Sequence, residues 1–288
     1  MSIKHRFLAA AYQPLKLGNE LLRKVSGHHG GRLRVLLYHD IAPTDEARFE
    51  AQLRWLSRYW RFVTPSDFAA MIFGDEPVVE DCLLLTFDDG FSSNRQIAET
   101  VLNPMGIKAL FFIVSEYAVM SDTADWRGFV AQNIYPGIEP EKIPAQWRNM
   151  CWDDLAYLLE TGHSIGAHTA HHARLSQVAP VDLAEEIISS ADVLEQKLGI
   201  NKVEHFAYTF GDLASFSPVA LSVARSRFKF IYTGLRGLNA SVVAPWAIRR
   251  DTMTANDSLS LVGALLEGGA DRFYTTSLAI YESWGQEA

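Results

Sequence analysis

Short apolar runs alternate with amphipathic helical patterns along most of this chain, and this order limits the folds that the chain can adopt. Residues 33–38 (LRVLLY) form a short apolar run bounded by turn residues, which is typical of a buried strand. Residues 46–59 place Phe49, Leu53 and Leu56 on one side of a helix. The same patterns predict strands at residues 82–87, 108–114, 164–167, 205–208, 228–232 and 246–248, and helices at residues 94–103, 152–161, 181–198, 215–225 and 258–266. The repeated strand–helix order predicts an α/β fold with a mainly parallel sheet, open or closed as a barrel.

The predicted sheet occupies a single domain of residues 32–288, preceded by an N-terminal extension and linker of residues 1–31. Residues 121–149 interrupt the rhythm with about thirty residues rich in Pro, Gly, Asn and aromatic side chains. An insertion of that length is often a functional lid, and a packed surface excursion fits its composition equally well.

Charge is divided unevenly along the chain. The net charge is −8, which argues against nucleic acid as a partner, because phosphate binding depends on clustered Lys and Arg. Residues 1–25 hold five Lys and Arg against Glu20, so this leader is +4 and the rest of the chain is −12. The leader mixes leucines with basic residues, which predicts an amphipathic helix that associates peripherally with a membrane surface. A helix packed on the domain is the alternative, and Pro14 and Gly18 interrupt the pattern.

No export signal is expected in this leader. Its apolar run, residues 7–12, is only six residues long and is closed by Gln13-Pro14. No stretch approaches the roughly 20 apolar residues of a membrane span, and Cys82 and Cys151 alone provide no disulfide framework. A cytoplasmic location follows as an expectation.

Two adjacent acids follow the most apolar predicted strand. Residues 83–87 (LLLTF) lead directly into Asp88, Asp89 and Gly90. Carboxylates at the carboxyl end of a parallel strand stand where α/β folds place their sites. Asp-Gly is also a common turn pair, but two acids would allow one to bind a metal and the other to accept a proton.

A histidine cluster follows a later strand, with His168, His171 and His172 inside residues 163–175 (HSIGAHTAHHARL). Histidines at i and i+4 converge on one ion if the segment forms a helical turn. Together with Asp89 they would provide two nitrogens and one oxygen, leaving a position open for water, as catalytic zinc requires.

These two motifs, TFDDG at residues 86–90 and HTAHH at residues 168–172, resemble those of the polysaccharide deacetylases of carbohydrate esterase family 4, the NodB-homology domain. The resemblance covers roughly residues 35–250. It implies a distorted (β/α)7 barrel that uses a divalent metal to remove acetyl groups, usually from N-acetylated sugars. On this pattern Asp88 is the general base, and Asp89, His168 and His172 are the metal ligands. His171 falls on a variable position and is left out of the site.

A further motif, LLYHDI at residues 36–41, resembles a branch of the family in which the histidine after the first strand is the general acid. That role falls to His39. A histidine that only hydrogen-bonds at a strand end is the alternative reading.

Residues 206–211 (FAYTFG) are similar to the family's FAYPFG, and here Thr209 replaces the proline, which should relax the loop. The matching backbone N–H that binds the carbonyl oxygen belongs to Phe210, and Tyr208 is expected to contact substrate. Ala207 stands where other members have an arginine that braces the base.

The pair Arg249-Arg250 could supply that charge instead; Arg250 matches the branch better, Arg249 stands at its proline position, and the sequence leaves open which of the two braces the base. An arginine held by Asp40 or Asp251 for structure alone is the alternative. Trp152 matches a tryptophan before the histidine motif, with core packing or sugar stacking as its two possible roles.

The resemblance therefore predicts a metal-dependent deacetylase that hydrolyses the N-acetyl group of an amino sugar in a polysaccharide or glycan precursor. Zn2+ is the expected metal, and Co2+ or Ni2+ would also fit two histidines and a carboxylate. One alternative is a deacetylase or deformylase of a lipid-linked or nucleotide-linked sugar. The other, suggested by Ala207 and Thr209, is a glycan-binding module without catalysis. The sugar, the linkage, the acyl group and the oligomeric state stay open.

Overall fold

The computed structural model describes residues 3–27, 30–120, 125–239 and 243–287. Within these residues, every strand pairs in parallel, and the sheet order is β7-β6-β5-β4-β3-β1-β8, with β2 beside the start of β3. The strands are β1 (Leu33–Tyr38), β2 (Arg61–Phe62), β3 (Cys82–Phe87), β4 (Ala109–Ile113), β5 (Ser164–Ala167), β6 (His205–Ala207), β7 (Phe230–Tyr232) and β8 (Asp251–Thr252).

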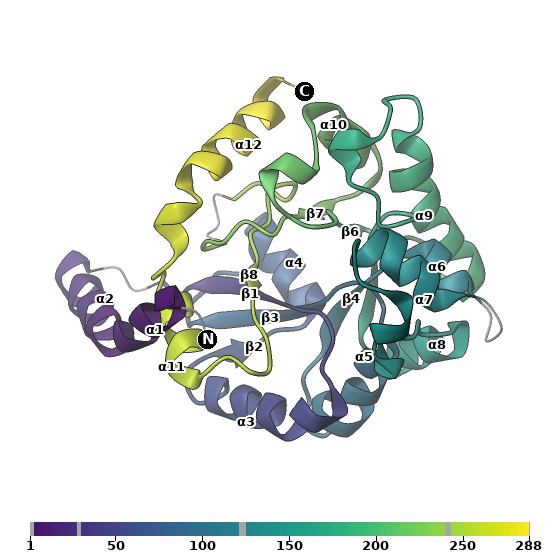
Figure 1. The fold of residues 1–288 in the computed structure, drawn as a ribbon. Helices are drawn as coiled ribbons and strands as arrows, with labels where there is room; N and C mark the ends of the chain where they lie inside the picture. Colours follow the sequence, from purple (N-terminus) through teal and green to yellow (C-terminus); the bar gives the residue numbers. More distant parts are fainter. Residues whose placement is uncertain (1–2, 28–29, 121–124, 240–242, 288) are drawn as a thin grey trace.

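Helices surround the curled sheet, and α1, α2 and α11 gather at one side of it (Figure 1). The α-helices are α1 (Ile3–Ala10), α2 (Tyr12–Ser26), α3 (Glu46–Leu56), α4 (Pro65–Phe73), α5 (Ser92–Ile97), α6 (Ser115–Val119), α7 (Trp126–Phe129), α8 (Trp152–Glu160), α9 (Leu183–Leu198), α10 (Pro218–Arg227), α11 (Leu259–Leu266) and α12 (Thr275–Glu287). Most predicted strands and helices are confirmed to within a few residues.

One late segment brings the two ends of the sheet together. Ile248 pairs in parallel with Tyr232 of β7, and the segment then continues into β8, where Thr252 pairs with Leu37 of β1. The sheet therefore curls into the predicted distorted barrel. The strand expected at residues 246–248 is misplaced. Ile248 makes only an isolated bridge to β7, and the chain then moves across to β1, where it forms a strand at Asp251–Thr252.

The strands bury both faces, as parallel strands between helices do. One apolar cluster lies inside the curl and includes Val35, Leu84 and Phe112, while alternate residues such as Leu36 and Leu85 belong to the larger cluster under the outer helices. Helix α4, which the sequence analysis did not predict, adds Phe68, Met71 and Ile72 to the inner cluster. Its start carried a signal, since Thr64 and Asp67 form a capping box before an apolar run.

The described part of the expected insertion, residues 125–149, has a packed interior of its own. Trp126, Val130 and Ile134 form a buried cluster with Phe91 and Tyr117. The ring of Trp147 stacks on the rings of Tyr135 and Phe91, with centroids 4.6 Å and 5.6 Å apart. This packing fits a fixed wall more closely than a loose lid. Residues 121–124 lie outside the described residues.

A buried ion-pair network holds the barrel's last strand to its first. Arg34 of β1 is 1% exposed and donates to Asp251 of β8 at 2.9 Å and to Asp271 at 2.5 Å. We predict that Arg34→Met lowers the free energy of unfolding by about 3–5 kcal/mol in urea denaturation, because it leaves the buried carboxylate of Asp251 with only Arg236, at 3.3 Å, as a charged partner.

The matched control is Arg61→Met, which removes a largely exposed pair with Glu80 and should cost at most about 1 kcal/mol. Equal, small losses in both variants would contradict this account of barrel closure.

Candidate metal and catalytic site

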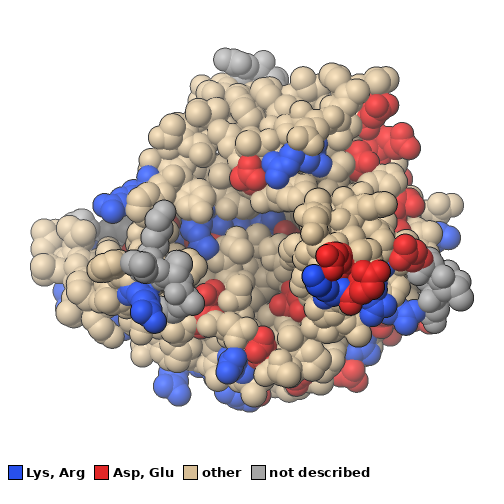
Figure 2. Space-filling model, viewed as in Figure 1, with Lys and Arg blue, Asp and Glu red and all other residues tan. Residues whose placement is uncertain are grey.

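The residues that follow β1, β3, β5 and β6 meet at one end of the barrel, around a pocket of about 160 Å³. The face drawn in Figure 2 is hollowed at its centre, with charged side chains at the walls of the hollow. The pocket is lined by eight of the nine predicted site residues, namely His39, Asp88, Asp89, His168, His172, Tyr208, Phe210 and Arg250.

Three of these residues present ligand atoms to one point. Oδ1 of Asp89 lies 3.5 Å from Nε2 of His168 and 3.3 Å from Nε2 of His172. Two ligand atoms held about 2.1 Å from one tetrahedral ion are about 3.4 Å apart, so these distances fit a shared cation. Oδ1 of Asp89 is buried and accepts no hydrogen bond from any described residue, which fits a group whose partner is an ion.

Backbone carbonyls orient both imidazoles. Nδ1 of His168 lies 2.9 Å from the carbonyl oxygen of Ala207, and Nδ1 of His172 lies 2.9 Å from that of Asn133. A carbonyl can only accept, so each Nδ1 carries the proton and each Nε2 keeps its lone pair for a metal. The residue Asn133 belongs to the insertion, so the insertion positions a ligand.

The carboxyl group of Asp89 is kept ionised. Burial raises the pKa of Asp89, but interaction with His168 and His172 lowers it by more. The pKa of Asp89 therefore lies well below its ordinary value. A carboxylate that stays ionised is what metal binding requires.

Asp88 has a different partner, Arg250. Nη1 and Nη2 of Arg250 donate to the two carboxylate oxygens of Asp88 at 2.6 Å and 2.9 Å, while Nε of Arg250 donates to the carbonyl of Thr233 at 2.8 Å. Asp88 is 2% exposed and Arg250 is 0% exposed. Oδ2 of Asp88 also lies 3.7 Å from Nε2 of His168, so this carboxylate faces the same space as the ligand set.

This pairing separates the two arginine candidates. Arg250 braces Asp88, whereas Arg249 pairs with Glu282 at 2.7 Å. Neighbouring residues of an extended chain point in opposite directions, so only one of the two can face the pocket.

Four residues other than glycine have φ in the left-handed region within the described chain, and all four lie around this pocket. They are Asp89, Thr169, His172 and Phe210, with φ between 58° and 76°. Such residues cost of order 1–3 kcal/mol each and gather at functional sites. The helical turn expected between the two histidines is therefore wrong, because Thr169 and His172 bring the imidazoles together through a left-handed loop.

Thr209 tethers the loop that it was expected to relax. Its hydroxyl donates to the carbonyl of Ala173 at 2.5 Å, and its own carbonyl accepts from Ser215 at 3.0 Å. The next residue, Phe210, contacts His172 with its ring at 4.7 Å between centroids. Its N–H donates to no acceptor among the described residues. A hydrogen bond thus replaces the proline ring as the constraint on this loop.

His39 lies at the end of β1 and lines the pocket. Its carbonyl accepts from the amide of Asn94 at 2.8 Å, which fixes the backbone, and no described residue hydrogen-bonds to its ring. The neighbouring Asp40 accepts from Nε1 of Trp147 at 2.7 Å and so faces the insertion. A ring without a structural partner fits a chemical role better than a strand-end hydrogen bond.

The remaining predicted contacts divide between the pocket and the core. Tyr208 is buried beside the pocket, stacked on Phe216 at 4.0 Å. Trp152 begins α8, packs against the main core and does not line the pocket. His171 points away and pairs with Glu186 at 2.8 Å.

The insertion also contributes Ile134 and Tyr135 to the pocket, and the sequence analysis did not assign either of them to the site. The aromatic composition of residues 121–149 was the only available signal for Tyr135.

Comparison with known proteins decides the family. A family model for polysaccharide deacetylases matches residues 75–226, just over half of the chain. The chain belongs to the polysaccharide deacetylase family. Membership confirms that the motifs resemble those of this family.

Among curated proteins, YxkH of Bacillus subtilis (strain 168), which carries the polysaccharide deacetylase name, is 25% identical over 170 residues. The match covers 57% of this chain and 52% of the relative, so the chain spans about half the length of that relative.

Two solved structures share the fold. IcaB from Ammonifex degensii is 24% identical with a TM-score of 0.66, and the match covers 83% of this chain and 98% of IcaB. The deacetylase PplD of Streptococcus pyogenes, solved with acetate, is 19% identical with a TM-score of 0.64, and the match covers 81% of this chain and 97% of PplD. At these identities the likeness concerns the fold, and the branch suggested by residues 36–41 stays a prediction.

The geometry predicts which residues hold a metal. We expect His168→Ala and His172→Ala to lower the Zn2+ retained after dialysis from about one equivalent by at least tenfold, because each removes a ligand. Phe210→Ala, which changes the same wall of the pocket without removing a ligand atom, should retain the metal. Metal content measured by plasma mass spectrometry checks this, and full retention in either histidine variant would contradict the ligand assignment.

Proposed function

We propose that this polysaccharide deacetylase hydrolyses the N-acetyl group of an amino sugar in a glycan, with one divalent cation, Zn2+, held by Asp89, His168 and His172. The observation that carries the proposal is the presence, in one pocket, of a three-atom ligand set and a separate carboxylate braced by Arg250. Metal-assisted amide hydrolysis needs side chains that hold the metal and a separate side chain that accepts a proton from water.

When bound, the cation would polarise the acetyl carbonyl and make an attacking water more acidic. Asp88 accepts the proton of that water, since its carboxylate faces the ligand set at 3.7 Å from His168. Arg250 holds both oxygens of Asp88 in place, so the acceptor keeps one orientation. The proton thus moves over a short path to a fixed atom.

The backbone of Phe210 stabilises the charge that develops on the acetyl oxygen. Its N–H has no acceptor among the described residues, and its left-handed φ of 61° is supported by the tether at Thr209. A fixed N–H of this kind stabilises an oxyanion without reorganisation. Because a backbone group does this, either phenylalanine or tyrosine could occupy position 210.

His39 donates a proton to the departing amine. It lines the same pocket from the end of β1, and its ring has no competing partner among the described residues. An amine leaves an amide only when it is protonated, so this step requires an acid. The products are acetate and the free amino sugar.

Both departures from the family pattern, Ala207 and Thr209, are compensated in the structure. Arg250 provides the charge that Ala207 lacks, and Thr209 holds its loop by a hydrogen bond. An inactive glycan-binding module would have no need for a braced buried carboxylate beside a metal-ligand set. The geometry therefore favours catalysis.

Two substrates distinguish the role of Asp88 as base from that of His39 as acid. We expect Asp88→Asn to lower kcat by about 10²–10⁴-fold on both an N-acetylated oligosaccharide and an aryl acetate ester. His39→Asn should lower kcat similarly on the amide but less than tenfold on the ester, because a phenolate leaves without protonation. Acetate release with both substrates is the measurement.

The variants need a folding control, since Asp88→Asn leaves the buried Arg250 without a charged partner. Retained zinc and a cooperative melting transition show that the variant is folded. Full activity of folded Asp88→Asn would refute its role as base, and equal losses on both substrates would refute the role of His39 as acid.

A further inference from the structure

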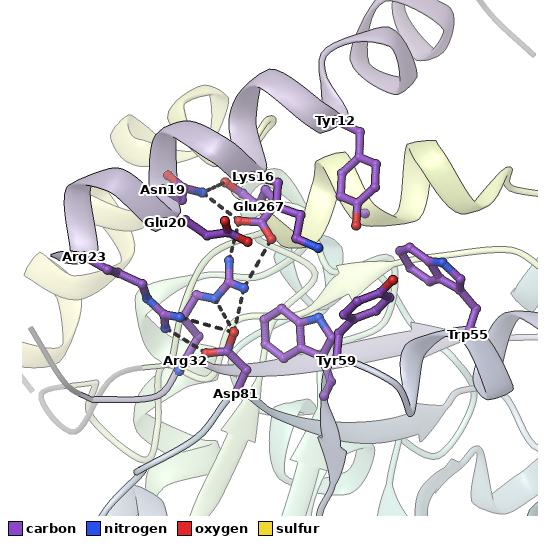
Figure 3. A pocket seen from close by; sticks show the side chains of 12 residues that line it. Tyr12, Lys16, Asn19, Glu20, Arg23, Arg32, Trp55, Tyr59, Asp81 and Glu267 are labelled. Atoms are coloured by element: carbon purple, nitrogen blue, oxygen red, sulfur yellow. Dashed lines mark hydrogen bonds and ion pairs between the residues drawn. The ribbon is translucent and has the colours of Figure 1, made fainter.

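Helix α2 docks on the domain through its polar side. The amide of Asn19 donates to Glu267 at 2.8 Å, Arg23 pairs with Asp81 at 2.7 Å, and the side chains point toward one another in Figure 3. Tyr12, at the start of α2, is 8% exposed and packs edge-on to Trp55 at 5.9 Å. These contacts fix which side of the helix faces the domain.

The opposite side of α2 is apolar and exposed. Leu17, Leu21 and Val25 follow one another at the four-residue spacing that makes one stripe, and with Leu22 they are 62–79% exposed. The helix is continuous despite Pro14 and Gly18, since a proline in the first turn is tolerated. A surface helix normally buries its apolar face, so this orientation is reversed and leaves the stripe available for a partner.

Charge indicates what the partner is. The leader of residues 1–25 is +4 and the rest of the chain is −12. Arg6 and Lys24 are exposed beside the apolar residues, and the surface over α2 in Figure 2 is mostly uncharged with basic side chains at its edges. An anionic bilayer would attract this leader and repel the acidic remainder, which orients the protein. None of the described helices is long and apolar enough to cross a membrane.

A large groove lies beside α1 of the leader and shares one lining residue with the catalytic pocket. It has a volume of about 930 Å³, and Thr252 lines both the groove and the pocket. Leu8 of α1 and Leu261 and Leu265 of α11 form apolar walls, and Phe7, which is 74% exposed, lies at its edge. A groove of this kind fits a hydrocarbon chain whose headgroup reaches the pocket.

We propose that α2 seats the enzyme on an anionic lipid bilayer and that its substrate is a lipid-linked glycan, whose chain passes along the groove at α1 and α11. This rests on the proposed deacetylation. Burial of the apolar stripe in the bilayer favours binding, and the basic residues add electrostatic attraction.

Flotation with vesicles tests whether α2 binds the bilayer. Full-length protein should float with vesicles of phosphatidylcholine and phosphatidylglycerol, and less with phosphatidylcholine alone or in 0.5 M salt. The variant Leu17→Glu/Leu21→Glu should lower the bound fraction at least fivefold. The matched control is Val181→Glu, at an equally exposed apolar residue before α9, 84% exposed, which should float as the original protein does.

A second measurement tests the substrate. Catalytic efficiency on an acetylated amino sugar linked to a polyprenyl phosphate in vesicles should exceed that on the same sugar without lipid at least tenfold. The advantage should vanish in Leu17→Glu/Leu21→Glu, while turnover of the soluble sugar stays unchanged in all three proteins.

Three outcomes would overturn the proposal: no flotation of the original protein, equal flotation of the double variant, or equal efficiency on the two substrates. A dimer in sedimentation that the double variant splits, without flotation, would assign the stripe to self-association instead. Loss of all turnover with intact flotation would refute the deacetylase proposal and leave the bilayer seat standing.

Discussion

The buried ion pair between Asp88 and Arg250 is the interaction on which the site depends. Asp88 follows β3, and Arg250 comes from the late segment that pairs with β7 and then with β1. Burying either charge alone would cost several kcal/mol. Closure of the barrel therefore places Arg250 beside Asp88. The carboxylate of Asp88 in turn fixes the segment that closes the barrel.

Backbone geometry does much of the remaining positioning. Carbonyls of Ala207 and Asn133 set the tautomers of the two histidines, and left-handed residues turn each motif toward the pocket. The conformational cost of those residues is met by packing elsewhere, chiefly the two large apolar clusters and the aromatic packing of the insertion. A ligand set built in this way needs little rearrangement when an ion binds.

The residues that sequence could identify are those whose chemistry is local. Asp88 and Asp89 follow an apolar strand, and His168 and His172 share one short motif, so residue type and spacing were sufficient. The choice between Arg249 and Arg250 was not fixed by sequence, because it depends on which way an extended residue points. Asn133 contributes only a carbonyl, which every residue has, and the left-handed loop at Thr169 mimics helical spacing. Those features depend on tertiary contacts that a sequence pattern does not record.

The central claim is that Asp89, His168 and His172 hold one cation beside a braced base. Anomalous diffraction from crystals soaked in Zn2+, recorded on both sides of the zinc edge, tests it most directly. The account predicts one strong peak about 2.0–2.2 Å from Oδ1 of Asp89 and from Nε2 of both histidines, with Asp88 still paired to Arg250. A peak ligated by Asp88, or the absence of zinc between these three atoms, would contradict it.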